Sequence, residues 1–147
     1  MMKKTKLNLI FAAFLALAAL PSQANDTDHP AAACPSQDFS SYIQSFANNA
    51  AVQQAHTSTP LRMIALVDAE PEPRPETRWL GLDQIRFPLM PTIDEQKRMH
   101  LSLRINASSR HVRNVRLSGS DTGYLVKYRF EYRSNCWKLV SVDDQSL

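Results

Sequence analysis

The sequence is poor in the residues on which many catalytic and metal sites depend. Its 147 residues include only three glycines and two cysteines. With so few glycines, the chain has no phosphate-cradling loop and no Gly-x-Ser-x-Gly nucleophile elbow. The four histidines show no ligand spacing such as His-x3-His, so we expect neither a metal nor a cofactor. Motifs alone therefore assign no reaction to this protein.

Long apolar runs are scarce, and the main one lies at the start of the chain. Residues 7–20 are mostly apolar, follow Lys3, Lys4 and Lys6, and precede Ser22-Gln23-Ala24. This pattern is typical of a secretory signal peptide, because the apolar part is shorter than the ~20 residues that span a bilayer. We expect residues 1–24 to be removed after Ala24 and the protein to be exported to a bacterial periplasm without a stable membrane anchor. An uncleaved anchor is the alternative.

An excess of one charge is also missing once the signal peptide is set aside. The chain has 17 Lys and Arg against 14 Asp and Glu, and three of the lysines belong to the expected signal. The basic pI therefore gives no argument for a nucleic-acid partner. The charge is uneven, however, with eight acids and three bases in residues 26–83 and four acids and eleven bases in residues 86–138. Such asymmetry can steer an acidic partner, or the two halves can neutralise each other within the fold.

The two cysteines predict one structural disulfide. Cys34 and Cys136 lie 102 positions apart and form no Cys-x-x-Cys redox motif. In an oxidising compartment a lone pair is most simply a disulfide, and closing so long a loop stabilises a chain by up to about 4.7 kcal/mol in the chain-entropy account. We expect a flexible N-terminal segment over residues 25–35 and a single domain over residues 36–147.

Periodicity predicts helices first and strands afterwards. Residues 36–55 are helical in pattern, with Ser36 as the N-cap, Asp38 in the first turn and a break at Asn48-Asn49. Residues 92–100 form a second helical region, with the capping-box spacing of Thr92 and Glu95. Strands are predicted over residues 61–67, 77–82, 112–117, 124–133 and 136–142, with a proline-rich loop over residues 70–75.

The strand pattern over residues 124–133 is the clearest in the chain. Aromatic and aliphatic side chains alternate with mostly charged ones, which predicts one aromatic face and one charged face. In the last strand, Trp137 and Leu139 would point one way and Val140 and Val142 the other, as in a strand buried on both sides. Helices followed by an antiparallel meander predict an α+β domain.

Four segments follow one another along the chain: DFSSYIQSFANNAAVQQ, TPL with its strand, DQIRFPLMP, and the closing DTGYLVKYRF with NCWKLVSVDDQS. In this order they resemble exported bacterial members of the nuclear transport factor 2 superfamily whose function is unknown. The resemblance covers most of the mature chain. It implies N-terminal helices packed on a curved, cone-like antiparallel sheet whose concave face forms a pocket lined by Tyr124, Tyr128 and Trp137. Enzymes of the superfamily place Asp or His bases in that pocket, but no position here matches such a motif.

Asp143 and Asp144 complete the candidate pocket. Adjacent residues on a strand face opposite sides, so the two carboxylates cannot share one proton as a catalytic dyad would. Either one could act as a general base if it were buried in a cavity. Otherwise both satisfy backbone groups at the frayed end of the sheet, which is the reading that we favour.

Two functions remain open from the sequence. The favoured one is a non-catalytic periplasmic protein that binds a protein partner or a small apolar ligand, as an immunity or inhibitor protein does, with Lys127, Arg129 and Arg133 as the candidate partner face. The alternative is a pocket enzyme, isomerase- or dehydratase-like, that uses a C-terminal Asp as base. A dry pocket holding a carboxylate would favour the enzyme, whereas a cone filled by its own aromatics beside a charged face would favour the binder. We expect a monomer or a homodimer.

Overall fold

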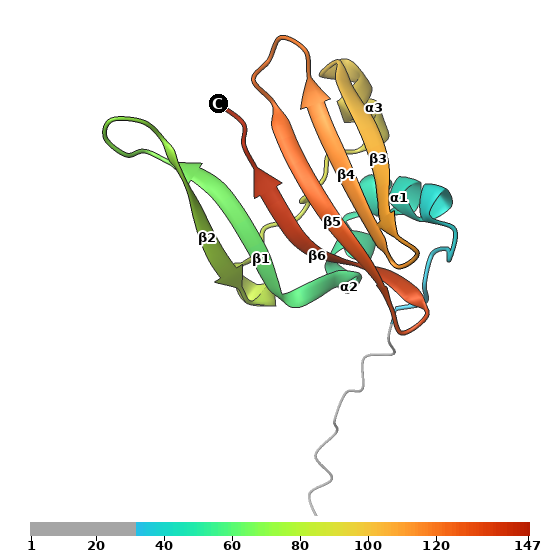
Figure 1. Ribbon diagram of the computed structural model, residues 1–147. Coiled ribbons are helices and arrows are strands. Elements are labelled where there is room, and N and C mark those ends of the chain that lie inside the picture. Colours follow the sequence, from blue (N-terminus) through green and yellow to red (C-terminus); the bar gives the residue numbers. More distant parts are fainter. Residues whose placement is uncertain (1–31) are drawn as a thin grey trace, which may run out of the picture.

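The computed structural model describes residues 32–147, so the expected signal peptide, its cleavage after Ala24 and residues 25–31 lie outside the described residues. Figure 1 shows three helices and a curved sheet of six strands. In chain order the elements are α1 (Phe39–Asn48), α2 (Ala50–Ala55), β1 (Thr57–Val67), β2 (Arg74–Leu80), the 3-10 turn η1 (Leu82–Gln84), α3 (Ile93–Arg98), β3 (Leu101–Ser109), β4 (Val112–Gly119), β5 (Leu125–Arg133) and β6 (Cys136–Asp144). Within this part of the chain, no helix is both long and apolar enough to cross a membrane.

The helices begin and end at side chains that satisfy backbone groups. Asp38, rather than the predicted Ser36, caps α1 by accepting a hydrogen bond from Ser41 N at 2.9 Å. A carboxylate two residues further on is a better acceptor for the helix N-terminus than the Ser36 hydroxyl, which accepts from Asp38 N instead. Asn49 separates α1 from α2 and caps α2, as predicted, and the capping box of Thr92 and Glu95 is confirmed.

The α+β class and the curved sheet are confirmed. The strand order is β2-β1-β6-β5-β4-β3. Four of the neighbouring pairs are antiparallel, but β1 and β6 are parallel, so the sheet is mixed. The chain crosses from β2 to the opposite edge through η1 and α3, and the meander β3 to β6 then returns to lie beside β1 in the same direction.

Strand β3 is absent from the predicted strands. It pairs with β4 over its whole length, from Leu101 opposite Gly119 to Ser109 opposite Val112. Its alternation of apolar and polar residues has the period of a strand, but the weakly strand-forming sequence NASS at its end hides the signal. The meander therefore has one more strand than predicted, and β3 forms its outer edge.

One face of the sheet is covered by helices and filled with aromatic rings. In Figure 1, α1 and α2 lie behind the strands. Phe46 of α1 meets Phe130 of β5 with ring centroids 5.1 Å apart, and Phe39 meets Trp137 at 4.8 Å. Phe46 and Phe130 are both fully buried. The interior of the cone is therefore occupied by the protein's own side chains.

A β-bulge changes the faces of β6. Arg129 pairs with Ser141 and Phe130 with Leu139, so Val140 has no partner on β5. The extra residue brings Val142 to the same buried face as Trp137 and Leu139. The predicted alternation of Val142 against Leu139 is therefore wrong, and the other face of β6 presents Ser141 rather than a second apolar layer.

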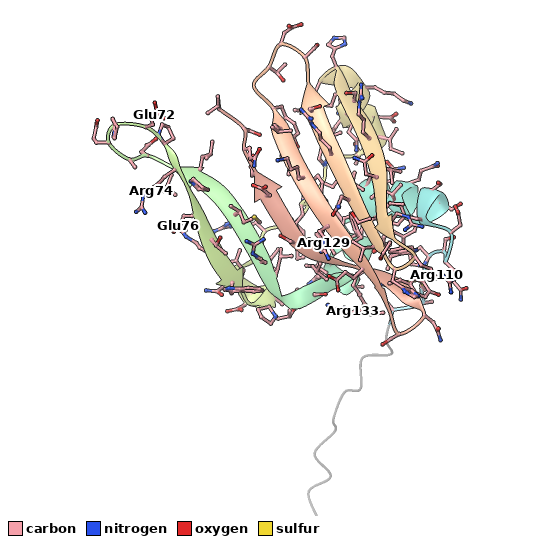
Figure 2. The ribbon with its side chains drawn as sticks, viewed as in Figure 1. Glu72, Arg74, Glu76, Arg110, Arg129 and Arg133 are labelled. Carbon is pink, nitrogen blue, oxygen red and sulfur yellow. A yellow bond between two sulfur atoms is a disulfide. The ribbon has the colours of Figure 1, made fainter. Side chains whose placement is uncertain are left out.

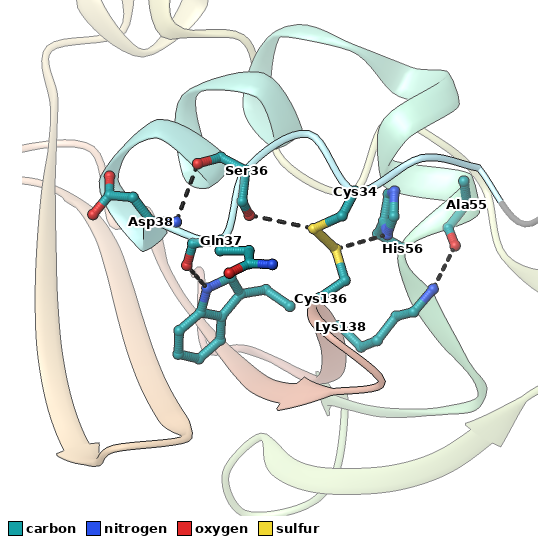
Figure 3. The surroundings of a disulfide bond; sticks show 9 residues. Cys34, Ser36, Gln37, Asp38, Ala55, His56, Cys136 and Lys138 are labelled. Atoms are coloured by element: carbon teal, nitrogen blue, oxygen red, sulfur yellow. Dashed lines mark hydrogen bonds between the residues drawn. A yellow bond between two sulfur atoms is a disulfide. The ribbon is translucent and has the colours of Figure 1, made fainter.

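The predicted disulfide joins Cys34 to Cys136, with Cα atoms 5.6 Å apart (Figure 3). It ties the start of the described chain to β6, which lies in the middle of the sheet. His56 is buried beside it, with Nδ1 3.6 Å from Cys136 Sγ. Close by, Trp137 Nε1 donates to Gln37 O at 2.9 Å. The disulfide and these contacts fix the segment that leads into α1.

Candidate binding groove on the open face of the sheet

The face of the sheet opposite the helices carries two straight rows of residues that cross all six strands. The register places directly paired residues on the same face, and neighbouring strands lie about 4.8 Å apart. Both rows start at β3 and end at β2. The first, called the basic row, consists of Arg104, Arg116, Lys127, Asp143, Ile64 and Thr77. The second, called the amide–indole row, consists of Asn106, Asn114, Arg129, Ser141, Arg62 and Trp79.

These rows line two connected hollows. One has a volume of about 340 Å³ and is lined by members of both rows on β3, β4, β5, β6 and β1. The other has a volume of about 390 Å³ and lies toward β2, beside Trp79. The two share Arg62, Arg129 and Ser141 and so adjoin each other, and we call them together the open-face groove.

The groove is cationic at its β3–β5 end. Arg104 lies opposite Arg116, and Arg116 opposite Lys127, so three bases stand side by side on adjacent strands. Lys127 Nζ lies 4.0 Å from Asp143 Oδ2 and donates to Gln145 Oε1 at 3.0 Å. Among residues 32–147, no carboxylate lies within 4.0 Å of the Arg104 or Arg116 guanidinium. Like charges placed opposite each other weaken a sheet, so stability of the sheet does not explain why these three bases lie side by side.

All three residues of the predicted partner face belong to β5 and point to the open side of the sheet, where Figure 2 labels Arg129 and Arg133. Lys127 and Arg129 line the hollow at the β3–β5 end of the groove, and Arg133 lines the hollow at its other end. Glu131 binds both arginines, with its Oε1 3.2 Å from Arg129 Nε. Although partial burial raises the pKa of Glu131, hydrogen bonds and charge from Arg133 and Arg129 hold that pKa below its ordinary value.

The structure does not bring the five candidate pocket residues together. Tyr124, Tyr128 and Asp144 lie near one another on the helix-covered face, and Trp137 lies further along that face. Tyr128 is buried, and its hydroxyl donates to Leu89 O at 3.0 Å. Burial, followed by the nearby Tyr124 and Asp144, raises the pKa of the Tyr128 hydroxyl. Asp143 lies on the opposite face, in the open-face groove.

The C-terminal residues after β6 hold the end of the strand. Asp143 Oδ2 accepts from Gln145 Nε2 at 3.0 Å, and Asp144 Oδ1 accepts from Ser146 N at 3.0 Å. Ser146 Oγ in turn accepts from Leu125 N at 3.1 Å. Both carboxylates are thus engaged in local hydrogen bonds of the kind expected at the end of a sheet.

The groove contains residues that the sequence did not single out. They come from β1, β2, β3 and β4 and are Arg62, Trp79, Asn106, Asn114 and Arg116, with Arg104 beside Arg116 on the same face. The period of two over residues 101–109 could have revealed β3 and, with it, the face that holds Arg104 and Asn106. No local signal sets the cross-strand register that aligns these side chains.

Comparison with known proteins gives one informative result. No family model matches the chain, and no curated protein matches it either. Among solved structures, the chain is similar to an NTF2-like protein from Bacteroides fragilis NCTC 9343, with 17% identity and a TM-score of 0.54 over 75% of this chain and 47% of the other. The chain therefore spans about half the length of that protein. At this identity the likeness shows the fold, and the nuclear transport factor 2-like fold expected from the sequence is confirmed. Such a fold is consistent with a ligand-binding or pocket protein, and it leaves the function to be argued from the site.

Proposed function

We propose that the protein is an exported, non-catalytic binding protein that takes an acidic protein partner in the open-face groove. The observation that carries this proposal is the run of Arg104, Arg116 and Lys127 on neighbouring strands. Three adjacent cations repel one another in the unbound protein, and an acidic surface laid over them would turn that repulsion into attraction. Exposed Trp79 at the other end of the groove adds the kind of aromatic anchor that dominates protein interfaces.

The packing of the helix-covered face supports binding over catalysis. The rings of Tyr42, Phe46 and Phe130 fill the space in which a cone-shaped fold could hold a small apolar ligand. Asp143, the C-terminal carboxylate that does line a hollow, lies near Lys127 and accepts a hydrogen bond from Gln145. A general base needs a desolvated carboxylate beside a bound substrate, and this surface position does not supply one.

Export is supported by two independent features. The N-terminal sequence has the layout of a signal peptide. The disulfide between Cys34 and Cys136 is compatible with an oxidising compartment such as the periplasm. One form of this function is an immunity or inhibitor protein, which blocks an enzyme of the same compartment. Capture of an acidic enzyme in a one-to-one complex would identify this form.

The test is affinity capture from periplasmic extract with the mature, oxidised protein as bait, followed by mass spectrometry. The double variant Arg104→Glu/Arg116→Glu should lose a stoichiometric partner that the wild type retains, and raised salt should weaken capture because the contact is electrostatic. The matched control is Lys97→Glu/Arg98→Glu, which makes the same charge change on exposed positions of α3. Equal loss in both double variants, or no stoichiometric partner at all, would contradict the proposal.

A further inference from the structure

We infer that the partner enters the open-face groove as an amphipathic α-helix that crosses the strands, with carboxylates over β3 to β5 and an apolar side chain against Trp79 of β2. This inference rests on the proposed function and specifies the part of the partner that binds. It follows from three features of this face: the spacing of the cations on β3 to β5, the exposed indole of Trp79 on β2, and the absence of a helix on this face within residues 32–147.

The spacing of the cations fits a helix better than an extended segment. Arg104, Arg116 and Lys127 are paired on three successive strands, which puts them about 4.8 and 9.6 Å along the row from Arg104. Helix positions i, i+3 and i+7 share one face and rise about 4.5 and 10.5 Å, close to the spacing of the cations. An extended chain presents same-side residues only every ~6.7 Å and falls out of step after the first contact.

The two ends of the groove offer different contacts. Its β3–β5 end holds Arg116 and Lys127 with Asn106 and Asn114, and Arg104 borders it on β3. At the β1–β2 end, Trp79 is 62% exposed, with Arg62 directly opposite it and Arg133 in the same hollow. Five strand spacings separate β3 from β2, or about 24 Å, which corresponds to roughly 16 residues of helix. The matching segment carries carboxylates over β3 to β5 and, over β1 and β2, an apolar side chain for Trp79 with an acceptor for Arg62.

The open face also suits a helix as a layer of the fold. The opposite face is covered by α1 and α2, whereas the described residues place no helix over the groove (Figure 1). Sheets with helices on both faces are a stable arrangement, so a partner helix would supply the missing layer. A second copy of the protein docked face to face would instead set one basic row against another, at a cost in repulsion.

Photo-crosslinking can measure the length and direction of the bound segment. A photoreactive residue is placed at Ser102, beside Arg104 on β3, in one variant and at Thr77, near Trp79 on β2, in a second variant. Position 98 on α3 is the control. After irradiation in periplasmic extract, the crosslinked partner residues are mapped by mass spectrometry. We expect both open-face positions to reach one continuous partner segment, at sites about 12 to 18 residues apart, and position 98 to reach no partner.

The outcomes separate the helix from the proposed function. If no partner is crosslinked or captured, both the proposed function and this inference fail. If the Arg104→Glu/Arg116→Glu variant loses the partner but the two crosslinks fall in separate segments, or fewer than about six residues apart, the helix is wrong and the proposed function stands. A captured species that resists protease would not be a protein and would overturn both.

Trp79 provides a second measurement at the β2 end of the groove. Because Trp79 is exposed, Trp79→Ala should fold normally, and we expect it to weaken binding of the captured partner at least tenfold. Leu82→Ala is the matched control, since Leu82 is an exposed apolar residue of η1 outside the groove lining. Equal affinities of Trp79→Ala and the wild type would show that the partner does not reach β2, and the 24 Å helix would be wrong.

Discussion

Arg116 of β4 lies directly opposite Lys127 of β5, and on its other side it lies directly opposite Arg104 of β3. A sheet selected only for stability would place a carboxylate beside each of these bases, as it does with Asp143 beside Lys127 and with Glu131, which binds Arg129 and Arg133 further along β5. Natural proteins keep destabilising residues where function needs them. The pair of Arg104 and Arg116, which has no such carboxylate within residues 32–147, therefore marks the part of the open face that we expect to bind.

Replacing the central cation should affect stability and binding in opposite directions. We expect Arg116→Gln to raise the free energy of unfolding by about 0.5 kcal/mol, because two like-charge contacts across the strands are removed. The same variant should bind the partner more weakly. Urea denaturation measures the first effect and titration with the captured partner the second. Arg129→Gln is the control and should not be stabilised, because it loses the contact with Glu131. Destabilisation of Arg116→Gln would remove the argument from the basic row.

Gln53 joins α2 to the segment before α3 through its buried amide. Its Nε2 donates to Met90 O at 2.8 Å, and its Oε1 accepts from Leu89 N and Met90 N at 2.6 and 3.0 Å. Gln53→Ala would leave these buried backbone groups without partners, so we expect a loss of about 3 kcal/mol in chemical denaturation. Gln54→Ala, at the exposed neighbouring position, should change the unfolding free energy by less than about 0.5 kcal/mol. Equal effects of the two variants would show that the amide network contributes little.

Tyr42, unlike Gln53, has a buried polar group without a hydrogen-bond partner among residues 32–147. Its side chain is fully buried, and within the described residues its hydroxyl has no hydrogen-bond partner. Burial accordingly raises the pKa of this hydroxyl. Tyr42→Phe keeps the ring contacts with Phe46 and Phe130 and removes the unsatisfied group, so we expect stability to be unchanged or higher by about 1 kcal/mol. Thermal denaturation checks this, and a loss of more than about 1 kcal/mol would show that the hydroxyl is satisfied in solution.

The fold was more accessible from the sequence than the groove, for reasons that differ between elements. The alternation in residues 124–133 and the Thr92–Glu95 capping box are local signals, and both elements form as predicted. The bulge at Val140 is set by pairing with β5 rather than by the sequence of β6, so the face of Val142 was mispredicted.

The groove depends on long-range register in the same way. Arg62 and Trp79 meet Arg129 only because β6 returns beside β1, a parallel contact that no local pattern indicates. Lys127, Arg129 and Arg133 could be identified because they share one strand. The remaining cations of the open face come from other strands, and their alignment is a property of the assembled sheet.

Removal of the disulfide should lower stability substantially. Cys34 and Cys136 close a loop of 102 positions, for which the chain-entropy account gives up to about 4.7 kcal/mol. We expect Cys34→Ser/Cys136→Ser to lose about 3 to 5 kcal/mol in the free energy of unfolding, and reduction of the wild type to lose a similar amount. The double variant treated with the same reductant is the control and should not change further. A loss below about 1 kcal/mol would mean that the reduced chain already restricts this loop.

The stability of the protein should fall as the pH is lowered below about 6.5, and His56 should account for part of that fall. Burial, with the charge of Lys138, lowers the pKa of His56 from its ordinary value of 6.5, while the backbone of Ala33 acts weakly in the opposite direction. The side chain of Tyr42 and the disulfide also face the imidazole. At His56 the unfolded chain then binds a proton more readily than the folded one. The contribution of His56 to stability therefore rises with pH through the window below 6.5 and is level above it.

Denaturation at pH 7.5 and 5.5 tests this contribution. The difference in unfolding free energy between the two pH values should be smaller for His56→Gln than for the wild type, whereas His111→Gln, at an exposed position, should keep the wild-type difference. Identical differences in all three proteins would mean that His56 is protonated in the folded state as readily as in the unfolded chain.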